Sequence, residues 1–227
     1  MEFQNNIITL DNIMLNMNFN QQVIINTNNL HWQASPKAGV WRKPLAREEV
    51  ENGHVTSIVR YDAGSHFSSH PHIKGEEIYV IEGTFSDESG DYPAGSYIRN
   101  PEGFSHKPFS VEGCLILVKL HQFQPGDTEQ VIIDTRNTPW LPGYGNLKVM
   151  PLHSYKGEST ALVFWPAGEK FIPHTHSGGE EIFVISGEFI DENGRNPQGS
   201  WLRSPHMSQH HPYVDQDTLI LVKTGHL

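Results

Sequence analysis

The feature that most constrains the fold of this chain is a motif that occurs twice, at a constant offset of 104 residues. The first copy spans residues 64–83 and the second spans residues 168–187, and both follow the pattern Gly-x5-His-x-His-x3-Glu-x6-Gly. With each fixed residue type at roughly a fifteenth of composition, one match has odds on the order of 10⁻⁶ per start position. Two matches in register therefore identify a duplicated unit.

Within the motif, the spacing of histidine and glutamate is that of metal ligands. His70 and His72 are one residue apart, and Glu76 follows four residues after His72. Because side chains alternate between the two faces of an extended strand, these three residues share a face with the apolar Ile78 and Val80. The spacing predicts an inward row of ligands followed by core residues. The second copy has the same residue types at His174, His176 and Glu180.

The repeat extends well beyond this motif. Residues 23–27 (Val-Ile-Ile-Asn-Thr) match residues 131–135 (Val-Ile-Ile-Asp-Thr). A period near 100 residues indicates a duplicated domain rather than a solenoid of 20–50-residue repeats. The domains expected are an N-terminal arm at 1–22, a first domain at 23–123, a linker at 124–130 and a second domain at 131–227. The arm is expected to pack on the first domain, and its exchange between the subunits of a homodimer is the alternative.

The predicted elements within each copy are short strands. Segments rich in β-branched and aromatic residues predict strands at 55–61, 77–81, 95–99 and 114–120. Turn signals lie at 87–90 and in the matching segment 191–194. Residues 44–50 offer at most a short helical turn. Many short strands separated by turns are typical of an all-β barrel or sandwich.

Composition narrows the classes of function. The 227 residues carry a net charge of −10 and one cysteine, Cys114. An acidic chain lacks the cationic surface that nucleic-acid binding needs, and one cysteine excludes an internal disulfide and a multi-cysteine metal site. No apolar run reaches the roughly 20 residues of a membrane span, and no basic region precedes an apolar core at the N-terminus. We therefore expect a cytoplasmic protein that binds neither nucleic acid nor membrane.

A second motif supplies one more histidine in each copy. His106 ends the pattern Gly-x5-Pro-x-Gly-x2-His that begins at Gly95. The second copy ends at His210, with Met207 where the first copy has Gly103. A histidine on a neighbouring antiparallel strand could complete a shell of three histidines and one glutamate.

Together the two motifs resemble those of the cupin superfamily, and residues 75–101 look like the ChrR-type cupin-like domain. The resemblance covers nearly all of both copies. It implies an all-β bicupin, that is, two tandem cupin barrels of the jelly-roll-like, double-stranded β-helix type. It also implies one divalent metal per domain, held by His70, His72, Glu76 and His106 and by His174, His176, Glu180 and His210. Ser110 and Val214 depart from the family pattern, which has asparagine at these positions.

The resemblance also bears on function. The founding members of this type are zinc-dependent anti-sigma factors, whose sigma-binding domain carries a His-x3-Cys-x2-Cys motif. Residues before Val23 contain neither histidine nor cysteine, so a sigma factor is not the expected partner. The expected function is a metal-binding bicupin that binds or responds to a small molecule or an oxidant. The alternative is an iron-dependent dioxygenase acting on a small dicarbonyl or hydroxyaryl ketone. No catalytic residue is assigned.

The ligand set leaves the metal open. Imidazoles and a carboxylate suit Zn or Fe first, and Mn, Ni or Cu as well. A closed tetrahedral zinc site would favour sensing, whereas an open coordination position beside an aromatic wall would favour an enzyme. Three further pairs of residues at matching positions carry expectations of their own. Glu77 and Glu181 are alternative or supporting ligands; Arg99 and Arg203 are expected to pair with acidic neighbours; and Lys119 and Lys223 are expected to face solvent.

Overall fold

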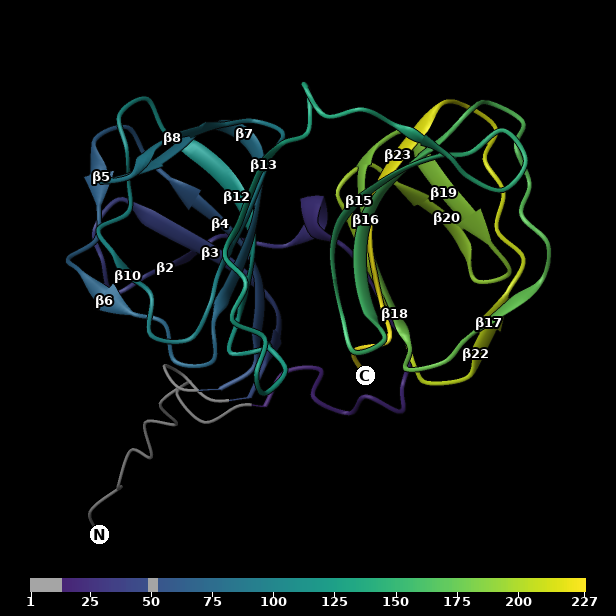
Figure 1. The fold of residues 1–227 in the computed structure, drawn as a ribbon, viewed down its shortest axis with the longest axis horizontal. Helices are drawn as coiled ribbons and strands as arrows, with labels where there is room; N and C mark the ends of the chain where they lie inside the picture. Colours follow the sequence, from purple (N-terminus) through teal and green to yellow (C-terminus); the bar gives the residue numbers. More distant parts are fainter. Residues whose placement is uncertain (1–13, 49–52) are drawn as a thin grey trace, which may run out of the picture.

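The structure, a computed structural model that describes residues 14–48 and 53–227, consists of two β barrels lying side by side (Figure 1). Residues 1–13 of the predicted arm lie outside the described residues. Within the described ranges the only helical element is a 3-10 turn at Thr27–Asn29. No helix in this part of the chain is long and apolar enough to span a membrane. The predicted all-β architecture of two tandem barrels is confirmed.

Each barrel is built on one large antiparallel sheet. The sheet of the first barrel has the order β13 (Val131–Asp134), β9 (Ser96–Asn100), β7 (Glu76–Asp87), β12 (Cys114–Leu120), β4 (Val55–Tyr61), β3 (Val40–Arg47) and β2 (Gln33–Ala34). The sheet of the second has the order β1 (Val23–Asn26), β21 (Ser200–Ser204), β18 (Glu180–Ser186), β23 (Thr218–Thr224), β16 (Glu158–Trp165), β15 (Lys148–Tyr155) and β14 (Leu141–Pro142). The helical turn considered for residues 44–50 is wrong as far as Arg47, because β3 continues to that residue.

Shorter strands complete the barrels away from the large sheets. In the first barrel they are β5 (Ser65–His66), β6 (His70–Pro71), β8 (Gly90–Pro93), β10 (Ser105–His106) and β11 (Phe109–Ser110). In the second they are β17 (His174–His176), β19 (Glu188–Asp191), β20 (Gly194–Pro197) and β22 (Ser208–His210). The pairs β6–β10 and β17–β22 carry most of the predicted metal ligands.

The two repeats exchange their first strands. Strand β1 opens the first repeat but pairs with β21 of the second, where Val23 lies opposite Arg203. Strand β13 opens the second repeat and pairs with β9 of the first, where Val131 lies opposite Arg99. Each barrel therefore consists of one sequence repeat whose first strand is replaced by the first strand of the other repeat.

The central strands of the large sheets are buried on both faces, because they lie between the interior of their own barrel and the other barrel. One face of each sheet lines a barrel interior, with Ile78 and Val80 in the first barrel and Ile182 and Val184 in the second. The alternate residues form a core shared between the barrels. Its buried members are Leu45, Ala46, Ile58, Tyr79, Tyr97, Leu117, Met150, Leu152, Leu162, Phe183, Trp201 and Leu221. Double burial explains strands that are apolar at nearly every position.

Two buried ion pairs link the barrels in a symmetrical arrangement. Glu77 of the first barrel accepts from Lys223 of the second at 2.7 Å, and Glu181 of the second accepts from Lys119 of the first. All four side chains are buried. The expectation that the lysines face solvent is wrong, because their strand face is the one covered by the other barrel. The same parity turns both glutamates away from the barrel interior, so they are not ligands.

Two buried arginines anchor the connecting segments. Arg99 donates to Asp127 in the segment between the repeats, at 2.9 Å, as expected for an acidic neighbour. Arg203 instead donates to the backbone carbonyl of Asn18, at 3.3 Å, and lies 4.8 Å from the centre of the Phe19 ring. The described end of the arm therefore contacts the second barrel, and it also pairs with the first barrel through a bridge between Leu15 and Arg47.

Replacing Lys223 tests the interface. Lys223 is 2.7 Å from Glu77 and 2.6 Å from Glu158, and all three are buried. Breaking a buried pair by removing one partner leaves uncompensated charge, so we expect Lys223→Met to lower the free energy of unfolding by about 3–5 kcal/mol. Urea titration measures the loss. The exposed Lys107 provides the control, since Lys107→Met should change stability by less than about 0.5 kcal/mol. Equal effects of the two substitutions would contradict a stabilising role for the pair.

The same network predicts a pH dependence. Burial raises the pKa of Glu77, but the charges of Lys223, Arg99 and Lys119 outweigh burial and lower it to about 2. A carboxyl group whose pKa is lowered by folding stabilises the native state above its ordinary pKa of 4.5, and that contribution is lost as pH falls toward 2. We expect the stability difference between wild type and Glu77→Gln to shrink steadily between pH 4.5 and pH 2 in denaturant titrations. The two proteins share their other titrating groups, so a difference that stayed constant would refute this account.

Candidate metal centres

In the first barrel, three short elements bring the predicted ligands together. His70 lies on β6 and pairs with His106 on β10 through the backbone. The chain then turns through Lys74 and Gly75, which have φ values of 61° and 78°, before Glu76 opens β7. The motif is therefore a strand, a turn and a strand rather than the single extended strand that the spacing suggested. Glu76 nevertheless shares the inward face of β7 with Ile78 and Val80, as expected.

Three of these side chains converge at one buried point. The Nε2 atoms of His72 and His106 face each other at 2.8 Å. Glu76 Oε2 lies 3.3 Å from His72 Nε2 and 3.4 Å from His106 Nε2. One donor atom from each residue lies within 4.8 Å of the others. The side chain of His70 lies outside the described part of the structure, so its position in the shell stays a prediction.

The electrostatics of this cluster suit a cation. Burial raises the pKa of Glu76 to about 8, although Asn100 donates a hydrogen bond to it at 3.2 Å. Asp87, also buried, adds negative charge nearby and raises the pKa further. A buried carboxylate that faces two imidazole nitrogens is the donor set of a divalent metal site. The residues present therefore fit the predicted metal.

An aspartate orients the histidine from behind. Asp87 Oδ2 is 3.1 Å from His106 Nδ1, which fixes the ring nitrogen that points at the centre. Its other oxygen accepts from the backbone N–H of Ser89, at 2.8 Å. Sequence reasoning assigned Asp87 to a turn only. Its match at Asp191, in register with the ligand repeat, was the signal that could have identified it.

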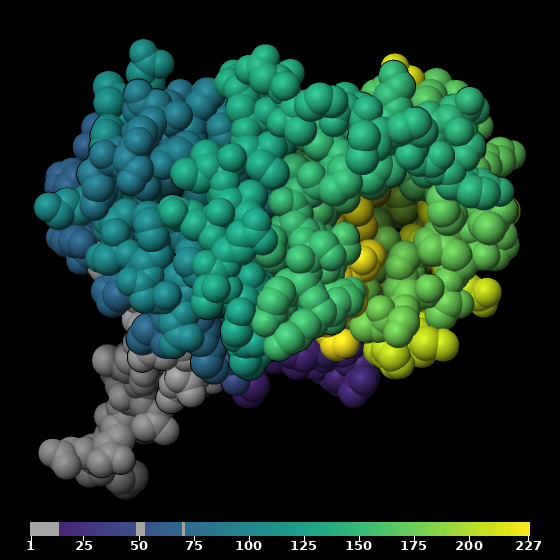
Figure 2. Space-filling view, viewed as in Figure 1, coloured from purple at the N-terminus to yellow at the C-terminus, as the bar shows by residue number. Residues whose placement is uncertain are grey.

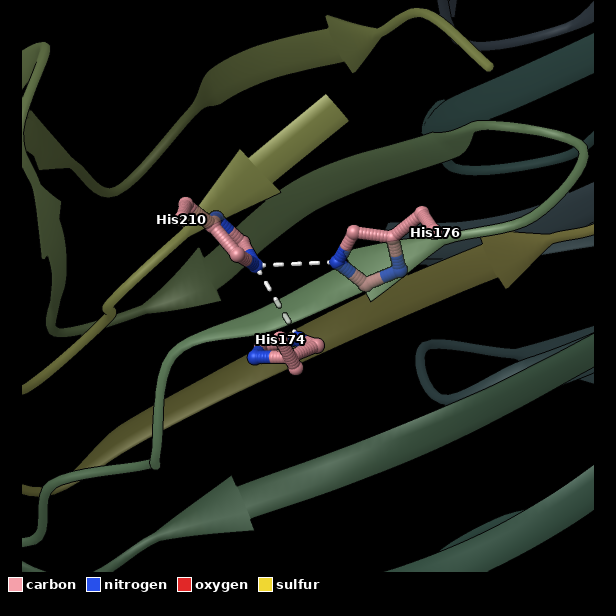
Figure 3. Close-up of side chains that lie close together, drawn as sticks. All are labelled: His174, His176 and His210. Carbon is pink, nitrogen blue, oxygen red and sulfur yellow. Dashed lines mark hydrogen bonds between the residues drawn. The ribbon is translucent and has the colours of Figure 1, made fainter. Parts of the chain in front are cut away.

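The second barrel repeats the cluster. His210 Nε2 lies 3.0 Å from His176 Nε2 and 3.2 Å from His174 Nε2. The three rings point their nitrogens at one another from β17 and β22 (Figure 3). Glu180 Oε2 lies 3.4 Å from His176 Nε2 and 3.6 Å from His210 Nε2. All four residues predicted for this barrel come together here, and metal binding by them stays a prediction.

In the second cluster, as in the first, burial disfavours the charged forms of the titrating groups and neighbouring charges add to or oppose that effect. Burial, with the neighbouring histidines, lowers the pKa of His176 to about 4, and burial raises the pKa of Glu180 to about 7. Burial also opposes protonation of His210, but Asp191 and Glu180 outweigh it and raise the pKa of His210. Asp191 stands behind His210 as Asp87 stands behind His106, with Oδ2 3.7 Å from Nδ1. The backbone N–H of Asn193 donates to Asp191 at 2.8 Å, so this aspartate also serves a turn.

Met207 does not change the turn before His210. Its φ is 61°, against 84° for Gly103 in the first barrel. Its N–H donates to the carbonyl of His176 at 2.8 Å, as the N–H of Gly103 donates to His72 at 3.1 Å. The left-handed backbone is therefore kept with a side chain that disfavours it. The departure from the family pattern is local strain and leaves the ligands in place.

Both clusters open into a cavity inside their barrel. The first cavity has a volume of about 490 Å³ and is lined by His72 and Glu76 among other residues. The second has a volume of about 300 Å³ and is lined by His174, Glu180 and His210 with aromatic and aliphatic side chains. The second barrel is hollowed on the face shown in Figure 2. A metal held by either cluster would be accessible to a small molecule in the cavity.

Comparison with solved structures supports the architecture. A Nostoc punctiforme protein proposed to be a dioxygenase superposes with a TM-score of 0.78 at 16% identity, over 92% of this chain and 84% of the other. The nickel(II) complex of a bacterial pirin from Escherichia coli gives 0.67 at 15%, over 90% and 98%. An oxalate decarboxylase from Bacillus subtilis gives 0.62 at 15%, over 89% and 76%. Identities this low show a shared fold.

Comparison with curated proteins finds no match. The sequence profile of the ChrR cupin-like domain, in contrast, matches the chain twice, over residues 20–124 and 128–227. Each match contains all four residues of one predicted ligand set. The chain therefore belongs to the ChrR cupin-like domain family and is a bicupin of the cupin superfamily.

Proposed function

We propose that each barrel holds one divalent metal ion and that the metal centre acts on a small organic molecule that enters the cavity. The observation that carries this proposal is that the clustered donors line cavities of about 490 and 300 Å³. Those volumes are typical of small-molecule sites. A purely structural metal site would instead be closed on all sides by protein.

The second cavity favours an enzyme that acts on a neutral carbonyl or aromatic compound. Its wall includes Trp165, Phe171 and Val163, next to His174 and His210. The Phe171 ring lies 4.6 Å from the His174 ring. These side chains exclude water and offer aromatic surface to a substrate. Asp191, whose Oδ2 lies 3.7 Å from Nδ1 of His210, would favour a proton on that nitrogen and leave Nε2 for the metal.

The proposed reaction class is oxygen-dependent cleavage of a dicarbonyl or hydroxyaryl ketone. Bound iron(II) would supply electrons to dioxygen. Zinc(II) would not, because it has no accessible redox change. The fold shared with a protein proposed to be a dioxygenase is compatible with this class. Response to an oxidant through a thiol has little support, because burial raises the pKa of Cys114 to about 11.

Metal content tests the first part of the proposal. Because both barrels retain their donors, we expect two divalent metal ions per chain by elemental analysis of protein purified without a histidine tag. Replacing His72 and His106 by alanine, or His174 and His176 by alanine, should each leave one ion. A wild-type chain that never holds more than one ion would refute a centre in each barrel.

Oxygen consumption tests the second part. We expect iron-loaded protein to consume dioxygen with at least one neutral 1,3-diketone or hydroxyaryl ketone, and the zinc-loaded form to consume none. Since the apolar cavity belongs to the second barrel, His210→Ala should abolish uptake and His106→Ala should leave most of it. If a broad panel of such carbonyl compounds drove no uptake, the oxygenase proposal would fail. Release of the metal by hydrogen peroxide would then support an oxidant-sensing role.

A further inference from the structure

The two cavities are built from equivalent positions of the two repeats. Strand by strand, the same residue types recur on their walls, offset by 104 residues. The matched pairs are Val59 and Val163, Phe67 and Phe171, Pro108 and Pro212, Ile116 and Ile220, and Val118 and Val222. Each barrel is therefore an internal reference for the other, and differences between the walls mark where the repeats have diverged.

The divergence is concentrated on one side of the cavity. Arg42 on β3 lies opposite Val59, and Val149 on β15 lies opposite Val163, so valine in the second barrel replaces arginine in the first. Lys37 and Tyr144 occupy the same position of the preceding turn, because each carbonyl accepts from the residue three places later. Arg47 is a third cation on the wall of the first cavity. The equivalent residue of the second repeat is Ser154, because Arg47 and Ser154 each pair with the first inward-facing residue of the strand that follows.

The first cavity is therefore cationic inside an acidic protein. Lys37, Arg42 and Arg47 line it, and among the described residues Glu76 is the only acidic lining residue. The chain as a whole has a net charge of −10. Within residues 14–48 and 53–227, no ion pair is formed by Lys37 or Arg42. Half-buried cations without a carboxylate partner favour an anion in the space they face.

The cationic side chains and the candidate metal centre face the same cavity. Arg42, Tyr61 and Glu76 line one and the same cavity. Because Arg42, His72 and Glu76 line a single cavity of about 490 Å³, a small ligand bound in it is exposed to both the arginine and the candidate centre.

We infer that the first barrel selects a small organic carboxylate, whose carboxylate group binds Arg42 and Lys37 while its other polar end reaches the centre formed by His72, Glu76 and His106. A guanidinium group binds a carboxylate through two parallel hydrogen bonds, which gives both affinity and orientation. The second barrel, with Val149 and Tyr144 at these positions, selects an uncharged molecule. The inference rests on the proposed function, since it specifies the substrate class of the same centres.

The test uses the zinc-loaded full-length protein and two probes with the same aromatic ketone skeleton, 4-oxo-4-phenylbutanoate and its methyl ester, in which a neutral ester group replaces the carboxylate. Isothermal titration is carried out after His174→Ala and His176→Ala have removed the second centre. We expect one carboxylate to bind per chain, at least tenfold more tightly than the ester. Lys37→Tyr with Arg42→Val copies the second wall and should weaken carboxylate binding about 10- to 100-fold, with the ester unaffected.

Two further variants guard against indirect effects. Arg42→Lys keeps the charge but loses the paired hydrogen bonds, so its affinity for the carboxylate should fall between wild type and the double variant. Lys107→Met removes an exposed charge outside the cavity lining and should change nothing. A thermal melt shows whether each variant is folded.

Equal affinities for acid and ester in the wild type would overturn the inference, and so would a carboxylate affinity that the double variant leaves unchanged. Failure of the proposed metal function gives a different result. In that case the protein takes up no zinc, and the selectivity of Arg42 and Lys37 is then decided by the same titrations on the metal-free chain.

Discussion

The packing of the two large sheets against each other is the interaction on which the rest of the structure depends. Because the interface covers the outer face of both sheets, β7 and β18 are buried on two sides. Each strand begins with two glutamates that point in opposite directions. Glu76 and Glu180 reach the candidate centres, while Glu77 and Glu181 form the ion pairs between the barrels. Adjacent residues thus tie the geometry of each site to the docking of its barrel on the other.

This double role explains which parts of the architecture could be predicted from the sequence. Strand signals and the register of the two copies were sufficient for the strands within each repeat and for the set of described residues that cluster, because those are properties of one repeat. The exchange of β1 and β13, which completes each barrel with a strand of the other repeat, could not be predicted from them. The burial of Lys119 and Lys223 could not be predicted in this way. Strand parity shows that a lysine faces away from the barrel interior, but it does not show that another barrel covers that face.

Asp87 and Asp191 illustrate a second limit. The segments containing them carry ordinary turn signals, and the structure shows that they do form turns. The same carboxylates also contact His106 and His210, which are distant in sequence. The role of these aspartates in a turn can be predicted from the local sequence, whereas their contact with a distant histidine cannot. The cavity walls illustrate a different limit. The sequence shows arginine at position 42 and valine at position 149, but only the structure shows that both side chains line a cavity beside a candidate centre.

The reciprocal exchange of β1 and β13 affects how the chain can be cut into separate domains and how its two sites can diverge in evolution. Cutting the segment between the repeats would yield two halves, each holding a strand that belongs to the other barrel. The architecture is equivalent to a strand-swapped dimer of single-barrel subunits joined end to end. In a dimer of identical subunits, any substitution appears in both sites at once. Joining the subunits in one polypeptide removes that restriction, so one site can acquire a cationic wall while its twin keeps an apolar one.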